Sequence, residues 1–212
     1  MKHFKFGNIN IVYTEKEDGN QRDKILRKEI ANKFGFEEIF IPVQTHTNKV
    51  TTIDNLKIEA DGIYTDEKNI PVGVLTADCV PIILFNDKEL AVVHGGWRGL
   101  FNGIIQNAVN KFQNKEIKAF VGANIKSCCY EVQKDFVENF KTKFNKNGFF
   151  EKRENGIYFN LNEFVKFILS DQKIELELIH ETDLCTKCVE NLYSYRKGNI
   201  EERILTFGWI SD

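Results

Sequence analysis

Short apolar runs dominate the middle of the chain. Val, Ile and Leu fill three segments, at residues 72–76, 80–85 and 90–94. Apolar runs of this length are typical of strands that are buried on both faces. The polar pair Asn86–Asp87 separates the last two runs and predicts a hairpin turn. Further strands are expected at residues 38–43, 49–53, 118–122, 175–179 and 203–209.

A different spacing marks the expected helices. After residues 95–96, apolar residues recur every three or four positions, which predicts one amphipathic helix over residues 99–112. Similar patterns predict helices over residues 21–34, 132–144 and 161–169. Asn160 is placed to cap the last helix, with Glu163 completing a capping box. Helices and strands mix without strict βαβ alternation, which favours an α+β fold with buried sheet layers over a doubly wound parallel sheet.

Length and charge narrow the class of protein. The 212 residues suit one domain spanning residues 1–212. A net charge of −2 gives no electrostatic footprint for nucleic acid, and no basic cluster suggests an anionic membrane. No segment is apolar enough for a signal peptide or a transmembrane helix. We therefore expect a cytoplasmic protein that binds neither nucleic acid nor membrane, with its oligomeric state open and a monomer as one option.

Two of the four histidines lie in unusual settings. His46 follows a predicted strand in Gln44-Thr45-His46-Thr47, and His94 opens the stretch His94-Gly95-Gly96-Trp97-Arg98-Gly99. Glycine has no Cβ, so the backbone can approach a ligand closely in the second stretch. The junction of a strand with a helix start is also a natural place for anions. Arg98 adds a planar cation that suits phosphate or carboxylate.

Cys79 lies between two predicted strands and is therefore expected at a bend. Two imidazoles and one thiolate, from His46, Cys79 and His94, can hold a transition metal and leave a fourth position open, as a catalytic zinc requires. Asp78 beside them could orient a histidine. The ligand spacings of 33 and 15 residues match no local motif. Core roles for the cysteine and the histidines therefore stay open on this reasoning.

The other four cysteines, Cys128, Cys129, Cys185 and Cys188, admit three interpretations. The simplest is that they are buried, unreactive thiols. A structural zinc site would need adjacent cysteines to serve one tetrahedron, and a Cys-x-x-Cys redox pair would lack a surrounding thioredoxin-like pattern. The odd total of five cysteines argues against a complete disulfide framework. Cys128 is also a candidate for the wall of a substrate pocket.

Taken together, the sequence resembles the YfiH family, also called the laccase-domain or multicopper polyphenol oxidase-like family. The matching stretches occur in the family's order and cover most of the chain after its first forty residues. They are Gln44-Thr45-His46, Ala60-Asp61-Gly62, Thr76-Ala77-Asp78-Cys79-Val80-Pro81, His94-Gly95-Gly96-Trp97-Arg98-Gly99, Cys128-Cys129-Tyr130-Glu131-Val132, Cys185-Thr186 and Tyr193-Ser194-Tyr195-Arg196.

The resemblance implies a single-domain, layered α/β/β/α fold. It also implies that His46, Cys79 and His94 share one metal ion, expected to be zinc, with copper as the alternative. Family members are described as purine nucleoside enzymes that phosphorolyse adenosine, inosine and methylthioadenosine and that deaminate adenosine. The expected small-molecule partners are then a purine nucleoside and phosphate. The candidate catalytic residues are Cys79, His94, Arg98 and Asp78, and the candidate substrate-binding residues are Arg98, Gln44 and Cys128.

Three other functions remain open. A metal-free hydrolase would use Cys79 as nucleophile and His94 as base. Copper-dependent polyphenol oxidation normally needs more histidine ligands than this chain can supply. A peptidoglycan-precursor quality-control factor would bind its ligand without catalysis. The chain departs from the family's usual motifs at residues 122–127 and 201–202, in loops expected to face the substrate, and it has no recognisable Ser-Leu-Asn-Leu segment before His46.

Overall fold

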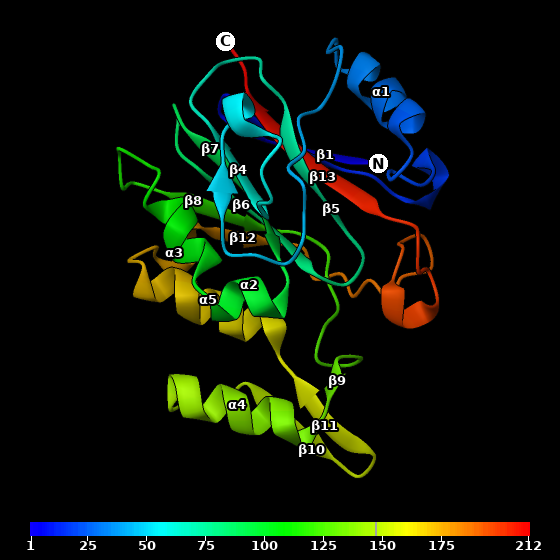
Figure 1. The fold of residues 1–212 in the computed structure, drawn as a ribbon, viewed down its shortest axis with the longest axis vertical. Helices are drawn as coiled ribbons and strands as arrows, with labels where there is room; N and C mark the ends of the chain where they lie inside the picture. Colours follow the sequence, from blue (N-terminus) through cyan, green and yellow to red (C-terminus); the bar gives the residue numbers. More distant parts are fainter. Residues whose placement is uncertain (147) are drawn as a thin grey trace.

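Two β-sheets lie face to face at the centre of the computed structural model, which describes residues 1–146 and 148–212 (Figure 1). The four-stranded sheet has the order β1 (Lys2–Phe6), β2 (Ile9–Tyr13), β13 (Ile204–Ile210), β5 (Val72–Thr76). The six-stranded sheet has the order β12 (Ile179–Glu181), β8 (Lys118–Val121), β6 (Val80–Phe85), β7 (Leu90–Gly95), β4 (Gly62–Thr65), β3 (Val50–Thr51).

Helices cover the outer faces of both sheets. The helices are α1 (Lys24–Lys33), α2 (Trp97–Phe101), α3 (Ile104–Val109), α4 (Lys134–Phe144) and α5 (Leu161–Asp171). Helix α1 packs on the four-stranded sheet, whereas α2, α3 and α5 pack on the six-stranded sheet. This order of layers confirms the predicted α/β/β/α fold. None of the described helices is both long enough and apolar enough to cross a bilayer.

The position of β6 and β7 explains their continuous apolar sequence. In β6, Ile83 and Phe85 belong to the core between the sheets, whereas Ile82 and Leu84 belong to the core under the helices. Successive side chains of a strand point to opposite faces, so a strand covered on both faces needs apolar residues at every position. The two strands form the expected hairpin, closed by the bond from Asn86 N to Glu89 O at 3.0 Å.

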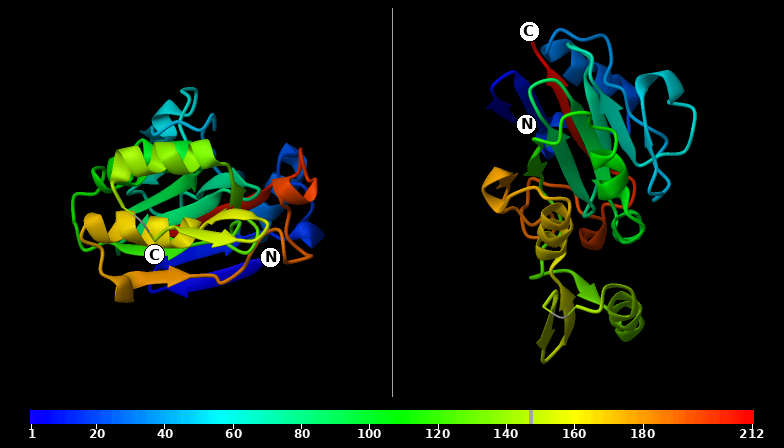
Figure 2. Two further views of the ribbon diagram at one scale, coloured as in Figure 1. Left: turned by 90° about the horizontal axis from the view of Figure 1, so that it is seen from below. Right: turned by 90° about the vertical axis from the view of Figure 1, so that its left-hand side faces the viewer.

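A smaller unit projects from the layered body (Figure 2). It contains α4 and a three-stranded sheet in the order β10 (Phe150–Arg153), β11 (Gly156–Phe159), β9 (Glu131–Val132). Phenylalanine rings attach it to the helix layer: Phe140 of α4 lies 4.8 Å from Phe164 of α5, and Phe144 lies 5.0 Å from Phe101 of α2, measured between ring centroids. The unit therefore shares one aromatic core with the body.

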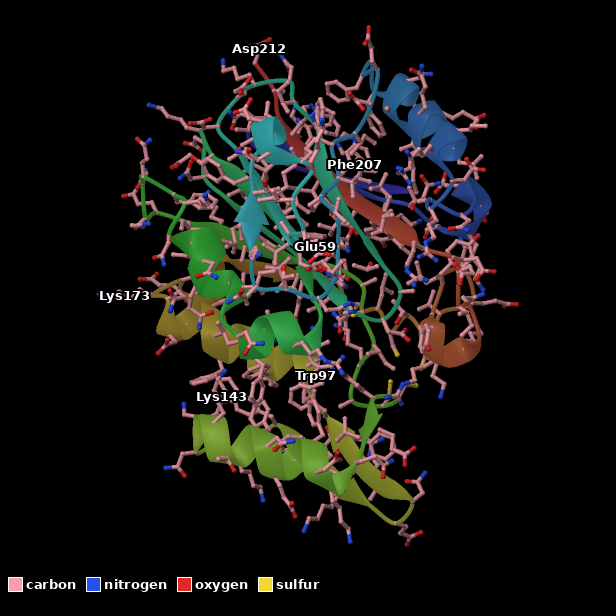
Figure 3. The ribbon with its side chains drawn as sticks, viewed as in Figure 1. Glu59, Trp97, Lys143, Lys173, Phe207 and Asp212 are labelled. Atoms are coloured by element: carbon pink, nitrogen blue, oxygen red, sulfur yellow. The ribbon has the colours of Figure 1, made fainter. Side chains whose placement is uncertain are left out.

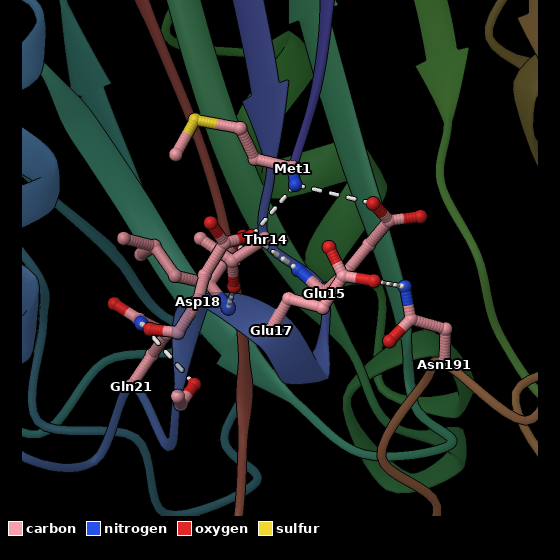
Figure 4. A network of polar contacts seen from close by, with 9 residues as sticks. Met1, Thr14, Glu15, Glu17, Asp18, Gln21 and Asn191 are labelled. Atoms are coloured by element: carbon pink, nitrogen blue, oxygen red, sulfur yellow. Dashed lines mark hydrogen bonds and ion pairs between the residues drawn. The ribbon is translucent and has the colours of Figure 1, made fainter.

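Charged groups anchor the start of the chain (Figure 4). The Met1 ammonium lies 3.1 Å from a Glu15 oxygen and 2.7 Å from an Asp18 oxygen. Asn191 donates to Glu17 at 3.4 Å and joins the loop before β13 to the same turn. These contacts hold β1 and β2 against the segment that leads into β13.

Several predicted elements differ from the structure. The strand expected at residues 38–43 contributes only isolated bridges at Phe40 and Val43. The helix expected at 99–112 is split into α2 and α3, because Gly103 adopts a φ of +87° that continues neither helix. Residues 176–178 form a 3₁₀ turn, so the strand predicted at 175–179 begins only at Ile179. Strands β1, β2, β4, β9, β10 and β11 were not predicted.

Candidate metal centre and pocket

Cys79 lies where the chain passes from one sheet to the other. Strand β5 belongs to the four-stranded sheet and β6 to the six-stranded sheet, and Asp78 turns between them with a left-handed φ of +84°. Strand β6 then runs antiparallel to β7, with Val80 opposite Gly95. Because β6 begins where β7 ends, Cys79 lies beside the end of β7 and close to His94. The bend expected at Cys79 is confirmed.

His94 is held by Asp61, the residue before β4. The pairing of Gly62 with Val93 brings the two together, and His94 N donates to Asp61 O at 2.7 Å. The side chains also meet, with His94 Nδ1 2.7 Å from Asp61 Oδ1, and both are buried. An ionised carboxylate can only accept, so Nδ1 donates its proton to Asp61, and Nε2 is the nitrogen that can bind a metal once its own proton is lost. Asp61 therefore prepares His94 to bind a metal through Nε2.

The same carboxylate shapes the loop that carries His46. Asp61 Oδ2 accepts from Thr47 N at 2.6 Å, from Thr47 Oγ1 at 3.0 Å and from Thr45 N at 3.2 Å. Between them, His46 adopts a left-handed φ of +62°. Such a conformation costs about 1–3 kcal/mol and persists only where the surroundings impose it. Asp61 thus positions both histidines. It bonds the ring of His94 directly, and it holds His46 through the neighbouring residues Thr45 and Thr47.

Gly96 leaves the space in which His46 lies. A Cβ at this position would be 2.8 Å from His46 Cδ2 and 3.6 Å from Cys79 Sγ. Gly99 likewise allows α2 to approach the loop, because a Cβ there would be 2.7 Å from the carbonyl oxygen of Thr47. Of the glycines expected to permit a close approach, Gly96 does so against two candidate ligands and Gly99 does so against the loop that carries His46.

The three candidate ligands come together as predicted. Their ligand atoms, on His46, Cys79 and His94, all lie within 4.8 Å of one another. In a tetrahedral zinc site, bond lengths of about 2.0–2.3 Å place nitrogen and sulfur ligands about 3.3–3.5 Å apart. Small side-chain movements would bring the three ligands to those distances. Two imidazoles and a thiolate are ligands that zinc prefers, so these three residues suit a zinc ion.

Each of the three ionisable groups Cys79, His94 and Asp61 changes the pKa of its neighbours. Burial alone would raise the pKa of the Cys79 thiol, but the charge of His94 and hydrogen bonds from both histidines lower it to about 6. Burial alone would lower the pKa of His94, but the Cys79 thiolate and Asp61 raise it to about 9. Burial also opposes ionisation of Asp61, and its bonds to His94 and Thr47 lower its pKa to about 2. Without metal, a thiolate and an imidazolium therefore coexist at neutral pH.

A cavity of about 660 Å³ opens onto the three ligands. This volume is typical of pockets for small molecules. Arginines from distant parts of the chain line it: Arg22, Arg98, Arg196 and Arg203. Aromatic side chains add flat walls: Trp97, Tyr130 and Tyr195. Trp97, labelled in Figure 3, also contacts the projecting unit, with its ring 5.2 Å from that of Phe136. The cavity thus combines cationic groups, aromatic faces and a candidate metal centre.

The other predicted site residues have different surroundings. Arg98 lines the cavity, with its guanidinium stacked on Trp97 at 4.5 Å. Asp78 also lines it, but its carboxylate accepts from Thr186 Oγ1 at 2.6 Å and from Arg196 N at 2.8 Å. The histidine partner suggested for Asp78 is therefore wrong, because Asp61 fills that position.

Gln44 and Cys128 were expected to bind substrate. Gln44 lines the cavity, but both ends of its amide bond the backbone of Leu75, at 2.8 and 2.7 Å. It therefore attaches the His46 loop to β5. Cys128 is not among the residues that line the cavity in the described chain; its sulfur lies among the three other cysteines.

Sequence reasoning missed several residues of the site. Asp61 was noted only as part of a matching stretch, and Arg22 was noted only within a predicted helix. Arg203 was noted only as the first residue of a predicted strand, next to an altered motif. The aromatic and basic residues of the stretch 193–196 were the clearest available signal, since Tyr195 and Arg196 both line the cavity.

Comparison with known proteins identifies the family. The model of the multi-copper polyphenol oxidoreductase laccase family matches residues 3–211. The chain therefore belongs to this family, which confirms the resemblance found in its motifs. Solved structures share the fold: a Neisseria meningitidis protein has a TM-score of 0.87 over 97% of this chain and 96% of its own, at 22% identity. Bacillus licheniformis YfiH has a TM-score of 0.83 over 96% and 93%, also at 22% identity.

Relatives with closer sequences have names that point to an activity. A purine nucleoside phosphorylase of Aquifex aeolicus is 38% identical over 178 residues, covering 81% of this chain and 82% of the relative. A purine nucleoside phosphorylase of Borreliella burgdorferi is 30% identical over 207 residues, covering 89% and 87%. Both relatives are thus named as enzymes that act on purine nucleosides.

Proposed function

We propose that this protein is a metal-dependent purine nucleoside phosphorylase. The observation that carries the proposal is one cavity in which a His–Cys–His group and four arginines face the same space. The metal would be held by His46, Cys79 and His94, with zinc preferred over copper because one thiolate and two imidazoles suit it. When bound, it would supply Lewis-acid activation of water or of a substrate oxygen.

The arginines suit the phosphate substrate. A guanidinium binds phosphate through two parallel N–H···O bonds, and several of them together favour a doubly charged ligand. Arg98 is exposed and lies in the helix directly after the ligand strand, so it can reach both the metal centre and the cavity. Phosphate would attack the sugar carbon that bears the base, the glycosidic C–N bond would break, and the base would leave as a free purine.

The aromatic walls suit the nucleoside. Tyr130 is half-buried and Tyr195 is exposed, so each offers part of a ring surface. Purine rings stack on such faces without a base-specific hydrogen bond, which fits the expected use of adenosine, inosine and methylthioadenosine. Asp78 lines the same cavity and is our candidate for proton transfer during phosphorolysis and during deamination of adenosine.

The direct test is product analysis with each nucleoside. Purified protein loaded with zinc should convert adenosine, inosine and methylthioadenosine to the free base only when phosphate is present, and should convert some adenosine to inosine without it. The base and inosine are separated by liquid chromatography. Removal of the metal with a chelator should abolish both reactions, and unchanged turnover would exclude the metal role.

A charge variant tests the phosphate site. Arg98→Ala should raise the KM for phosphate by about tenfold or more, because it removes a charge-assisted pair of bonds. Lys111→Ala removes the same charge from an exposed position outside the cavity lining and serves as the control. Equal phosphate KM values in the two variants would contradict the assignment of Arg98.

A second candidate is a metal-free cysteine hydrolase. It is favoured by the proximity of Cys79 and His94, whose ligand atoms lie within 4.8 Å of each other; this proximity lowers the pKa of the thiol to about 6 and raises that of the imidazole to about 9. A thiolate paired with an imidazolium is the usual form of a cysteine nucleophile. Activity that survives complete removal of metal but is lost when iodoacetamide alkylates Cys79 would support this function over phosphorolysis.

The remaining alternatives have less support. Copper-dependent polyphenol oxidation usually needs several histidine ligands, but only two of the described histidines reach the centre. His3 forms a hydrogen bond with Asn10 at 3.0 Å, and the His180 ring lies 4.6 Å from the Phe6 ring in a tilted arrangement; neither histidine lines the cavity. A role in the quality control of peptidoglycan precursors stays a prediction that a mutant's cell-wall composition would test.

A further inference from the structure

Four cysteines outside the cavity form a second cluster of ligands. The sulfur atoms of Cys128, Cys129, Cys185 and Cys188 all lie within 4.8 Å of one another. They come from two loops that are far apart in the sequence, one before β9 and the other after β12. We propose that these four thiolates bind a zinc ion in a structural site that joins the two loops. The proposal does not depend on the activity of the cavity.

The distances between sulfurs suit a metal better than a disulfide. Cys188 Sγ lies 3.4 Å from Cys129 Sγ and 3.6 Å from Cys128 Sγ. A disulfide requires about 2.05 Å between the two sulfurs. Four sulfurs at about 2.3 Å from one zinc ion are about 3.8 Å apart. The observed separations therefore lie close to the edges of a zinc tetrahedron.

The backbone of the second loop is arranged to present a thiolate. The N–H of Cys188 donates to the carbonyl oxygen of Cys185 at 3.1 Å, which closes a turn over the Cys-x-x-Cys stretch. The N–H of Val189 donates to the same carbonyl oxygen at 2.9 Å, so two backbone hydrogen bonds fix this turn.

A turn in the first loop allows two adjacent cysteines to reach the same cluster. The N–H groups of Cys129 and Tyr130 both donate to the carbonyl oxygen of Lys126, at 2.9 Å each. The resulting turn, over residues 127–129, directs the side chains of Cys128 and Cys129 to the same cluster. Two neighbouring cysteines can therefore serve one tetrahedron here, although their sequence spacing argued against it.

The chemistry of the cluster favours zinc. Four thiolates in contact repel one another, so a divalent cation must offset their charge if all four are ionised. Tetrahedral sulfur ligation is typical of zinc and of iron. Cys128 and Cys188 are exposed to solvent, which gives an ion a path into the cluster. Zinc does not change its oxidation state, so it suits a site with solvent access better than iron does.

The site would hold two walls of the cavity. Tyr130, which lines the cavity, follows Cys129 directly. Thr186 follows Cys185 and donates to Asp78 at 2.6 Å, next to the candidate ligand Cys79. A zinc ion shared by both loops would therefore fix the distance between the aromatic wall and the bend that carries Cys79.

Metal content of single-ligand variants tests the proposal. Protein made without a metal-binding tag is reduced, offered zinc, dialysed and analysed by mass spectrometry. Cys188→Ser removes an exposed ligand of the four-cysteine cluster, and His46→Ala removes a ligand of the cavity centre as the matched variant. We expect Cys188→Ser to bind about one zinc fewer per chain than the wild type. His46→Ala should keep about one zinc per chain, whether or not the cavity centre binds metal.

Cobalt distinguishes the four-sulfur site from any other. Cobalt(II) added to the metal-free His46→Ala variant should give the intense thiolate-to-cobalt charge-transfer absorption of four sulfurs, and Cys188→Ser in the same background should weaken it. If Cys188→Ser does not fold by circular dichroism, Cys128→Ser provides a second exposed ligand. Equal zinc content in wild type and the folded cysteine variant would overturn the proposal. So would a disulfide between the two loops, if the reduced protein takes up neither zinc nor cobalt.

Discussion

Asp61→Asn is the most informative substitution at the cavity centre. The change keeps the size of a fully buried side chain but turns one carboxylate oxygen into a donor. One oxygen faces His94 Nδ1, and the other faces three donors from Thr45 and Thr47. The amide should keep its oxygen toward the three donors and place its NH₂ against His94. The imidazole must then carry its proton on Nε2, the nitrogen that should bind the metal.

The expected magnitudes follow from these contacts. Removal of a carboxylate that orients a histidine ligand typically lowers metal affinity about 10–100-fold. The folded pKa of Asp61 is about 2, against an ordinary 3.8, so the charged form stabilises the fold by roughly 2–3 kcal/mol at neutral pH. Because this pKa is lowered, the stabilisation is complete above the ordinary value and is lost as the pH falls through about 2.

Two measurements check this prediction. Urea unfolding of metal-free protein should show Asp61→Asn less stable by about 2–3 kcal/mol at pH 7, with the difference shrinking toward pH 2. The zinc affinity of the folded protein, measured by competition with a chromogenic chelator, should fall about 10–100-fold. Asp54→Asn, at an exposed position, is the control. Unchanged zinc affinity in Asp61→Asn would refute the positioning role, and a stability loss independent of pH would refute the charge argument.

Three further predictions concern Gly96, His94 and the carboxylate of Glu89, which lies outside the cavity. Gly96→Ala should weaken zinc binding by about tenfold or more, because the new Cβ would lie 2.8 Å from His46 Cδ2. The free energy of unfolding should change by about 1 kcal/mol or less, because the φ of −68° at Gly96 suits any residue. Chelator competition and urea unfolding measure both effects. Zinc affinity should rise about tenfold per pH unit between pH 6 and 9, because binding displaces the proton that His94 retains up to a pKa of about 9; a flat profile would exclude the thiolate–imidazolium pair. Glu89→Gln should cost about 2–3 kcal/mol at pH 7 and leave zinc affinity unchanged, because the buried carboxylate accepts from Tyr64 at 2.9 Å and from two backbone N–H groups. Bonding lowers the pKa of Glu89 against the effect of burial, so this loss should shrink in acid, as unfolding at pH 3 and pH 7 would show.

Sequence by itself determined the centre of the fold and identified the candidate metal ligands. Strand β5 was predicted to the residue, and so was β6, because continuous apolar runs report burial on both faces of a strand. His46 and His94 were recognisable because they lie in unusual settings next to predicted strands, and Cys79 was recognisable because it lies at an expected bend between two strands. These signals are local, and the resemblance to a family joined them into one site.

Only the tertiary structure decided which residues support those ligands. Asp61 and Asp78 have equivalent chemistry, and Asp78 is adjacent to a ligand in sequence, yet Asp61 bonds His94 because the register of β4 against β7 places it there. The backbone bond from Gln21 N to Arg203 O, at 3.1 Å, likewise brings Arg22 and Arg203 together at the cavity that Arg98 also lines. Contacts between distant segments depend on pairing and packing that no short window of sequence contains.

The four-cysteine cluster shows the same limit. Cys128 and Cys185 are 57 positions apart in the sequence, and adjacent cysteines alone gave little reason to expect a shared tetrahedron. Parallel pairing of β8 with β12, continued by the bridge between Asn124 and Cys185, brings the two loops together. Local sequence therefore specified the thiols and the turns that carry them, whereas the pairing of two distant strands placed their sulfurs within reach of one ion.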